Sequence, residues 1–306
     1  MTFTQQALQK ALTFVQTQGR AIDLARLGRL LGTSSPSELE AELSAYQNSD
    51  GGFGHSLEPD FRSPNSSVLA TTLAFQIIRE TALKTASDMI PQAIAYLLRS
   101  FDGNLLTWRL VPYSSTELAQ APWWNEYSKQ PSLDAFCLNP TAEVLGYLTD
   151  YQDLVPTELI AQLTERILHH LGGLNNIIMH DFLCCKRLLD TSSLGPEVRN
   201  AIYSELSRLL PTVIATTLST WNQYNLRPIQ VVDRPDSLFI TPYADQVEIN
   251  LDFEVETQQP DGSWEPNWSW NNEHKEEWEK AKVEWKSALV VEKVSTLKRF
   301  SRIEVA

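Results

Sequence analysis

One short stretch of the chain concentrates side chains that transfer protons. Residues 54–62 read Gly-His-Ser-Leu-Glu-Pro-Asp-Phe-Arg, which places the carboxyls of Glu58 and Asp60 two positions apart. A carboxyl group that loses water on burial holds its proton closer to neutral pH and can then act as a general acid. Glu58 and Asp60 are therefore predicted catalytic residues. His55 is a third catalytic candidate that would tune these carboxyls, and Arg62 is a predicted substrate contact. Alternatively, Asp60 and Arg62 pair to fix the loop while Glu58 is solvated.

Aromatic side chains supply other candidate contacts. Residues 108–138 form a stretch too long for a simple helix connection, and it contains Trp123, Trp124 and Phe136. Long ordered segments between helices are often functional, and aromatic rings can line a hydrocarbon or sugar site. These three residues are predicted substrate contacts. Equally, the Pro-Trp-Trp run at residues 122–124 can act as a plug that packs the segment onto neighbouring helices.

His180 is a further predicted substrate contact, because it lies one helical turn from Cys184 and the two side chains can project from one face. The alternative is a core histidine whose hydrogen bonds are satisfied. Metal ligation has little support, since His169 and His170 are adjacent and cannot share a helical face. No metal site and no cofactor are predicted.

Helical elements must position these side chains. Apolar residues recur at three- and four-residue spacings along most of the chain. Residues 35–38 read Ser-Pro-Ser-Glu, a capping-box sequence, and the prolines at 140 and 196 mark two further helix starts. A fold of the all-α class is predicted. Residues 224–243 are interpreted as a lid or rim loop, or as a surface loop with ordinary ion pairs. The predicted helices cover residues 1–20, 21–31, 36–46, 68–80, 90–98, 142–151, 159–171, 177–189, 198–210 and 278–300.

A seven-residue pattern occurs twice. Residues 47–53 read Gln-Asn-Ser-Asp-Gly-Gly-Phe and residues 258–264 read Gln-Gln-Pro-Asp-Gly-Ser-Trp, so both follow Gln-x-x-Asp-Gly-x-aromatic. Glycine permits a left-handed backbone, aspartate favours the turn, and the aromatic ring packs it onto helices. Asp-Gly recurs at residues 102–103 and Gly-Gly at residues 172–173, each closing a helical run. The spacing is roughly that of a helical hairpin, and about six hairpins would fill the chain.

These two segments resemble the glutamine-tryptophan repeats of squalene-hopene cyclases and the related repeats of protein prenyltransferase beta subunits. The resemblance implies an α/α toroid, in which inner and outer rings of antiparallel helices surround an apolar cavity. It implies one such domain over residues 1–306, an isoprenoid or other apolar substrate, and metal-free cyclisation or isomerisation started by a proton. The turn aromatics Phe53 and Trp264 join the predicted substrate contacts.

The chain departs from the family at the catalytic motifs. The Asp-x-Asp-Asp acid of the cyclases and the Asp-Asp-x-x-Asp metal motif of ionising terpene synthases do not occur, so Glu58 or Asp60 would have to supply the acid. Prenyltransferase beta subunits bind zinc through Asp, Cys and His with an Asp-x-Cys spacing. Here Asp134 and Cys137 are separated by two residues, and with His180 they form no compact motif. No zinc is therefore expected.

Two other functions stay open. One is a carbohydrate-active or carbohydrate-binding toroid, in which tryptophans stack on sugar faces and Glu58 with a second carboxylate forms an acid/base pair. The other is a noncatalytic lipid-binding scaffold, which the missing acid motif favours, since a fold alone never establishes a function. A panel of oligosaccharides and farnesyl-type lipids separates the first from an isoprenoid enzyme.

The charge balance and the cysteine content limit which partners and which cellular compartment are expected. The chain has 25 Lys and Arg against 38 Asp and Glu, a net charge of −13, so it would repel nucleic acid. Three cysteines, two of them adjacent, are typical of a reducing cytoplasm. The first helix lacks the apolar run of a signal peptide, and residues 209–226, the longest uncharged stretch, are interrupted by proline and polar residues. A cytoplasmic protein with at most peripheral membrane contact is predicted, with no prediction of its oligomeric state.

Overall fold

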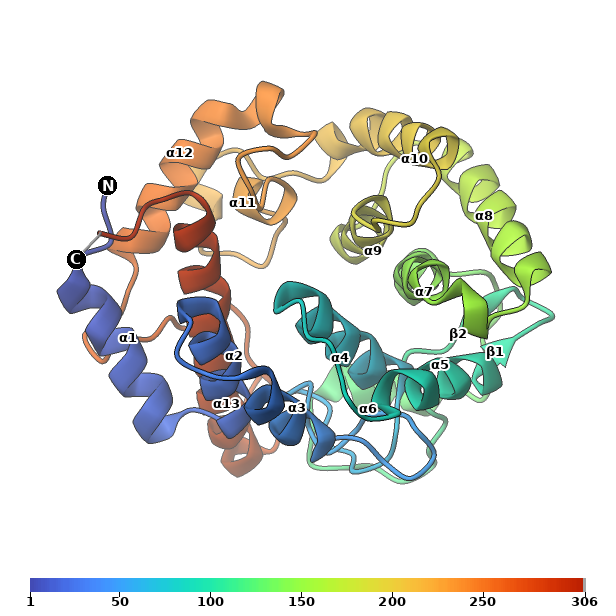
Figure 1. Ribbon diagram of the computed structural model, residues 1–306, viewed down its shortest axis with the longest axis horizontal. Helices are drawn as coiled ribbons and strands as arrows, with labels where there is room; N and C mark the ends of the chain where they lie inside the picture. Colours follow the sequence, from blue (N-terminus) through green and yellow to red (C-terminus); the bar gives the residue numbers. More distant parts are fainter. Residues whose placement is uncertain (305–306) are drawn as a thin grey trace. The chain divides into compact units, whose positions relative to one another are not determined.

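The computed structural model describes residues 1–304 of the chain (Figure 1). Within this part, helices dominate, and the sheet structure is one short antiparallel pair, β1 (Phe101–Asp102) and β2 (Thr107–Trp108). In that pair Phe101 lies opposite Trp108 and Asp102 opposite Thr107. The all-α class predicted from the sequence is confirmed.

The contacts divide the chain into two compact units. Unit 1 combines residues 1–43 with the residues from 214 onward, and unit 2 consists of residues 44–213. The helix α3 (Pro36–Ser44) begins in unit 1 and ends where unit 2 starts. A single domain over residues 1–306, and the ring that would close the predicted toroid, stay predictions.

Unit 2 is built from helices that alternate between two layers along the chain. Three helices lie side by side in one layer, and the other three pack along one side of it (Figure 1). This alternation is the helical-hairpin rhythm predicted from the repeat. The first layer contains α4 (Val68–Glu80), α7 (Leu138–Asp150) and α9 (Met179–Leu189); the second contains α5 (Met89–Arg99), α8 (Thr157–Gly172) and α10 (Pro196–Leu209). Short elements complete the unit: α6 (Pro122–Ser128), η1 (Gln152–Leu154) and η2 (Leu210–Thr212).

Unit 1 joins the two ends of the chain. Phe3 and Ile303 form a parallel bridge, in which the Phe3 amide donates to the Arg302 carbonyl at 2.7 Å and the Glu304 amide donates to the Phe3 carbonyl at 3.0 Å. Helices α1 (Gln5–Gln18), α2 (Ala21–Leu31) and α13 (Lys275–Arg299) pack together, and α11 (Pro228–Val231) packs on α12 (Ile240–Glu256). A short turn of 3-10 helix, η3 (Leu218–Thr220), precedes α11.

Local capping explains why several helix starts were predictable. Ser67 caps α4 by accepting a hydrogen bond from the Ala70 amide at 3.0 Å. Ser35 and Glu38 form the predicted capping box, with the Glu38 amide 3.2 Å from Ser35 Oγ and the Ser35 amide 2.6 Å from Glu38 Oε2. Each side chain thus pairs a backbone N–H that a helix start leaves without a partner.

Two predicted loops contain helices. Residues 224–243 hold α11 and the start of α12, and residues 108–138 hold α6. The α12 helix has few buried positions, Val247, Asn250, Leu251 and Glu254, and half of them are polar. Its apolar periodicity is therefore too weak to detect in the sequence.

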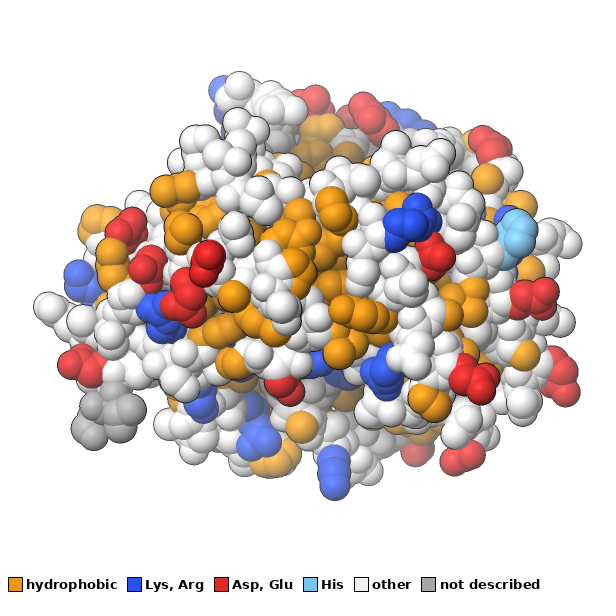
Figure 2. Space-filling model, turned by 90° about the horizontal axis from the view of Figure 1, so that it is seen from above, with side chains coloured by type: hydrophobic (Ala, Val, Ile, Leu, Met, Phe, Trp, Pro, Cys, Tyr) orange, Lys and Arg blue, Asp and Glu red, His pale blue; other side chains and the backbone are white. Residues whose placement is uncertain are grey.

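No helix in the described part of the chain has the length and apolar character needed to cross a bilayer. On the face of the molecule in Figure 2, Lys and Arg side chains lie singly or in small groups among Asp and Glu. This face has no broad basic area.

Candidate functional site

The candidate site lies in unit 2, beside the first repeat turn, residues 47–53. Gly51 adopts a φ of +86°, and the Asn48 amide donates to the Gly52 carbonyl at 2.8 Å while the Gly51 amide donates to the Asn48 carbonyl at 2.9 Å. The Gln47 amide group donates to the Gly51 carbonyl at 3.0 Å and to the Met89 carbonyl at 2.9 Å. The turn is therefore closed on itself and fixed to the first residue of α5.

Phe53 ends this turn in the core of unit 2. Its side chain is fully buried, and its amide donates to Thr71 Oγ1 on α4 at 3.0 Å. The Ser67 amide donates to the Phe53 carbonyl at 2.9 Å. Phe53 thus holds the turn against the start of α4, and this packing role accounts for its aromatic ring.

Residues 54–67 connect the turn to α4, and we call them the carboxyl loop. Glu58 and Asp60 are both buried in it. Burial raises the pKa of Glu58 well above 4.5, and the neighbouring Asp60 charge raises it further. Hydrogen bonds from the backbone amides of Phe61, at 2.6 Å, and Asp60 oppose this rise without cancelling it. Glu58 therefore holds a proton that a solvated glutamate would lose.

Helix α6 brings Trp124 to the same carboxyl. The Ala121 amide donates to the Asp60 carbonyl at 3.0 Å and fixes the start of α6 on the carboxyl loop. The Trp124 indole N–H favours the ionised form of Glu58, although its geometry falls short of a full hydrogen bond. The Trp124 ring meets the Phe61 ring edge-on, with centroids 6.3 Å apart. Of the three predicted aromatic residues, Trp124 is thus the one that meets the predicted carboxyls.

The other residues predicted around Glu58 are more exposed than the two carboxyls. His55 is exposed, and its Nε2 lies 2.9 Å from Asn48 Oδ1. Arg62 is half-buried and donates to the Pro59 carbonyl at 3.4 Å. Trp123, the neighbour of Trp124 on α6, is 37% exposed. Within residues 1–304, no hydrogen bond or ion pair joins His55 or Trp123 to the two carboxyls.

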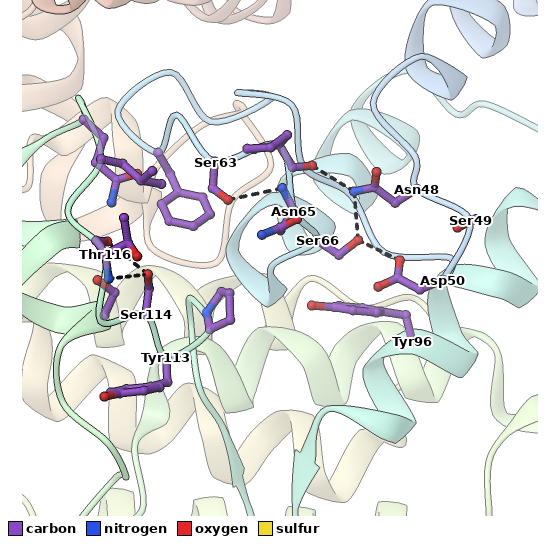
Figure 3. Close-up of a pocket in the computed structure, with 16 residues that line it drawn as sticks. Asn48, Ser49, Asp50, Ser63, Asn65, Ser66, Tyr96, Tyr113, Ser114 and Thr116 are labelled. Atoms are coloured by element: carbon purple, nitrogen blue, oxygen red, sulfur yellow. Dashed lines mark hydrogen bonds between the residues drawn. The ribbon is translucent and has the colours of Figure 1, made fainter.

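A cavity of about 740 Å³ lies between the first turn and the segment before α6. Asn48 Nδ2 donates to Ser66 Oγ at 3.0 Å, and Ser66 Oγ donates to Asp50 Oδ1 at 2.7 Å, so these side chains form a linked wall (Figure 3). Ser114 and Thr116 lie on the other side (Figure 3). The remaining lining residues are Ser49, Phe61, Ser63, Pro64, Asn65, Tyr96, Pro112, Tyr113, Leu118, Gln120 and Ser128.

Two tyrosines give this cavity aromatic surface. Burial raises the pKa of Tyr96 to about 12, so its hydroxyl stays protonated and can donate a hydrogen bond. Its ring packs against Gly52, where an added Cβ would lie 2.7 Å from the ring carbons. Tyr113 is 55% exposed at the cavity. Phe61 lines the cavity with its ring and binds Glu58 with its amide, so one residue connects the cavity to the carboxyl loop.

The remaining predicted site residues lie apart from this cavity. Phe136 is buried in the segment before α7, with the Arg166 guanidinium 4.8 Å from its ring centroid. His180 is exposed on α9, where desolvation and the Arg187 charge lower its pKa. Trp264 belongs to unit 1. It is buried and donates from its indole nitrogen to the Glu254 carbonyl at 2.9 Å.

A second polar cluster joins α4, α7 and α9, and sequence reasoning missed it. Glu143 on α7 is buried, and its carboxylate accepts hydrogen bonds from Gln76 at 2.7 Å and from Arg187 at 2.9 Å, as well as from Tyr147. Burial and the Glu143 charge raise the pKa of the Cys184 thiol far above 9.0, which excludes a reactive thiolate. The carboxylate is fully paired, so the cluster fixes three helices together. In the sequence, the only sign of this cluster was Glu143, a single glutamate in a largely apolar helix.

Metal ligands do not gather in the described residues: no group of three or more His, Cys, Asp or Glu side chains is close enough to hold an ion. The chain matches no known protein-family profile, and no curated protein is significantly similar to it. The family resemblance therefore rests on the two repeat turns and the helical rhythm.

Proposed function

We propose that the cavity beside the first repeat turn binds a small hydroxyl-rich ligand of the carbohydrate class. The observation that carries this proposal is the lining of the cavity, which is dominated by hydroxyl and amide side chains on both sides. Its volume of about 740 Å³ falls within the range of about 300 to 1,000 Å³ typical of small-molecule sites. Carbohydrate binding was one of the functions that the sequence left open, and we now propose it for this site in unit 2.

Hydrogen bonding favours a polyol over a hydrocarbon in this cavity. Each hydroxyl or amide that a ligand removes from water costs about 1 to 3 kcal/mol unless the ligand offers a partner. A sugar offers donors and acceptors around its ring, whereas an isoprenoid chain offers none. The Asn48, Ser66 and Asp50 side chains are already held in place by one another, so little ordering is needed on binding.

The aromatic rings complete the expected contacts. Tyr96 combines a flat apolar face with a protonated hydroxyl, which suits the mixed surface of a sugar. Tyr113 extends this surface at the opening of the cavity and is free to stack on a ligand. Trp123 and Trp124, which the sequence offered as stacking residues, do not line it.

A titration with monosaccharides and disaccharides, followed by saturation-transfer NMR and calorimetry, tests this proposal. Tyr113→Ala should weaken binding of any saccharide that binds by about fivefold, the equivalent of about 1 kcal/mol. Tyr224→Ala is the matched control, because Tyr224 is a tyrosine of unit 1 with the same 55% exposure. Equal weakening in both variants, or no binding of any saccharide, would contradict the proposal.

The isoprenoid-modifying enzyme predicted from the family resemblance is a second proposal, and Glu58 is the observation that favours it. A carboxyl whose pKa burial raises well above its usual range lies beside the Trp124 and Phe61 rings. Aromatic faces stabilise carbocations, so this cluster combines a proton source with the surroundings that a cyclisation or isomerisation needs. In this proposal the two units close into the predicted toroid around an apolar substrate.

Polyprenyl alcohols and diphosphates are the substrates that test this second proposal. Turnover that disappears in Glu58→Gln but survives in Glu265→Gln would support it, whereas no turnover by the parent protein would contradict it. The three cysteines are free thiols, which is consistent with a reducing compartment. We therefore include a cytoplasmic location, with peripheral membrane contact to collect substrate, in this proposal.

A further inference from the structure

A second cavity in unit 2 has a different chemistry. It has a volume of about 450 Å³ and lies between the last turn of α5, the β1–β2 hairpin and residues 131–133. Two arginines, Arg99 and Arg109, are in its wall, and Asp102 is the acidic residue among those that line it. Its other hydrogen-bonding side chains are Ser100, Asn104 and Ser132.

The Arg109 guanidinium is rigidly held but has no carboxylate partner among residues 1–304. Its Nε donates to the Val111 carbonyl at 2.7 Å, and its Nη2 donates to the Tyr127 carbonyl at 2.7 Å. The guanidinium also lies over the Tyr127 ring, 5.0 Å from the centroid. Nη1 is buried and has no hydrogen-bond partner within the described residues. The positive charge is therefore fixed in position and not neutralised by the protein.

Arg99 adds a second charge of the same kind. It is exposed on the last turn of α5 and donates to the backbone carbonyl of Asp50, and no ion pair joins it to a carboxylate of residues 1–304. Three other arginines of unit 2, Arg79, Arg187 and Arg208, each form an ion pair with a carboxylate, as Arg79 does with Asp150 at 2.6 Å. Two unpaired arginines beside one cavity are unusual in a chain with a net charge of −13, where carboxylates outnumber cations.

The negative groups near this cavity already accept hydrogen bonds from the protein. Asp102 Oδ1 accepts hydrogen bonds from the backbone amides of Asn104 at 2.9 Å and Leu105 at 3.1 Å. The C-terminus of α5 contributes about half a negative charge. Its Leu97 carbonyl accepts the Trp108 indole N–H at 2.6 Å. The two guanidinium groups carry two full positive charges. One carboxylate and the helix dipole offset only part of this charge, so the cavity is net positive.

We infer that this second cavity binds a small anion that carries a phosphoryl or carboxylate group. Guanidinium groups bind both anions through paired hydrogen bonds, and a fixed guanidinium loses little freedom on binding. Asn104 and the two serines supply neutral donors to the remaining oxygens. The inference does not depend on what fills the first cavity.

Titrations with inorganic phosphate and with acetate, at constant ionic strength set with chloride, test this inference. NMR of the amides of residues 99–109 should show saturable shifts with at least one of the two probes, and the tighter one identifies the anion class. Arg99→Gln should weaken binding about tenfold. Arg208→Gln is the matched control, because Arg208 is an arginine on α10 outside the cavity wall.

Arg109→Lys is the second variant, since it keeps the charge and removes the planar fork. This variant should also bind the anion more weakly than the parent protein does. Circular dichroism verifies that the variant keeps the parent fold. Arg99 makes one side-chain contact, with a backbone carbonyl, so Arg99→Gln decides the question if Arg109→Lys does not fold. Failure of both probes to saturate overturns the inference. So does equal weakening in Arg99→Gln and Arg208→Gln, which would indicate a general charge effect.

Discussion

The two repeat turns use the same backbone frame in two different units. Gln258 repeats the contacts of Gln47, donating to the Gly262 carbonyl and to the Ala7 carbonyl, each at 3.0 Å. Gly262 adopts a φ of +94°, close to that of Gly51. An added Cβ would lie 2.4 Å from the Gln92 carbonyl oxygen at Gly51 and 2.3 Å from that of Lys10 at Gly262. In both turns the glycine therefore packs on the helix three residues beyond the glutamine's partner.

The two turns differ in what surrounds the shared aspartate. Asp50 Oδ1 accepts from the Gly52 amide at 3.0 Å and from Ser66, and Asp50 lines the first cavity. Asp261 accepts from the Ser263 amide at 3.0 Å and forms an ion pair with Lys286 at 2.9 Å, and Lys286 also pairs with Glu265. The second turn is thus closed by charge pairing.

This difference indicates which positions of a repeat could give it a function. The glutamine, glycine and aromatic residue build the frame, while the variable positions and the segment that follows decide what the frame presents. After the first turn the chain buries two carboxyls and opens a polar cavity. After the second turn it forms surface ion pairs. The repeat pattern alone predicts the frame and not its use.

Removal of the turn aromatics should have the largest effect and tests whether the frames are equivalent. Trp264 and Phe53 are both buried, so each change to alanine should lower the free energy of unfolding by about 3 to 5 kcal/mol. Chemical denaturation measures this loss. Trp123→Ala, at a 37% exposed position, should change it by less than about 1 kcal/mol. If Trp264→Ala is neutral while Phe53→Ala is not, only the first turn depends on its aromatic clamp.

The two left-handed glycines should come next. Gly51→Ala and Gly262→Ala each force a side chain into a left-handed backbone, which costs about 1 to 2 kcal/mol, and each adds a backbone clash. Thermal unfolding should show a similar loss in both. Gly172→Ala is the control, because nothing lies within 4 Å of an added Cβ there and the residue is helical. A harmless substitution at either turn would break the structural equivalence.

The buried carboxyl of Glu58, in the carboxyl loop after the first turn, should make the free energy of unfolding fall as pH rises. The pKa of Glu58 is raised in the folded state, so the unfolded chain releases this proton first, from about pH 4.5 upward. The parent should therefore lose stability relative to Glu58→Gln as pH rises above 4.5. Below pH 4.5, where Glu58 is protonated in both the folded and the unfolded chain, the variant should melt close to the parent, because glutamine still accepts the Phe61 amide. Parallel pH profiles of the two proteins would show that folding leaves the pKa of Glu58 unchanged, which would contradict this prediction.

The carboxylates of the second turn should show the opposite and smaller trend. Desolvation alone would raise the pKa of Asp261 and of Glu265. Hydrogen bonds from Ser263 and Lys286 to Asp261, and from Lys286 and Lys282 to Glu265, outweigh it together with the lysine charges and lower both pKa values. Their contribution is present above the unfolded pKa and is lost as pH falls through the folded one. Both side chains are about 40% exposed, at 40% and 43%, so each pair contributes at most about 1 kcal/mol. Urea unfolding of Glu265→Gln at pH 3 and pH 7 should reveal a difference only at pH 7.

Local signals were predictable from the sequence, and contacts between distant segments were not. The bounds of α4 and the two turns were predicted correctly because a cap, a glycine and an apolar repeat all act over a few residues. The burial of Glu58 was part of the functional hypothesis, but the approach of Trp124 depends on how α6 packs on the carboxyl loop.

The first cavity was missed for the same physical reason. Its walls come from the first turn, the carboxyl loop, α5 and the segment before α6, and single serines or asparagines in such segments resemble ordinary loop residues. Phe136 was predicted from the long aromatic segment and His180 from its one-turn spacing to Cys184, but tertiary packing places them in other parts of the unit.

The matched aspartates give the most direct test of the central claim, that the first turn serves a ligand and the second serves only the fold. Asp50→Asn and Asp261→Asn both keep the oxygen that accepts the turn amide and remove one charge. We predict that calorimetric titration with the saccharide that binds most tightly shows a loss of about tenfold or more for Asp50→Asn, since a hydrogen bond to a charged group contributes about 1.5 to 3 kcal/mol. Asp261→Asn should bind as the parent does. Equal affinities of the two variants, or equal losses, would contradict the account.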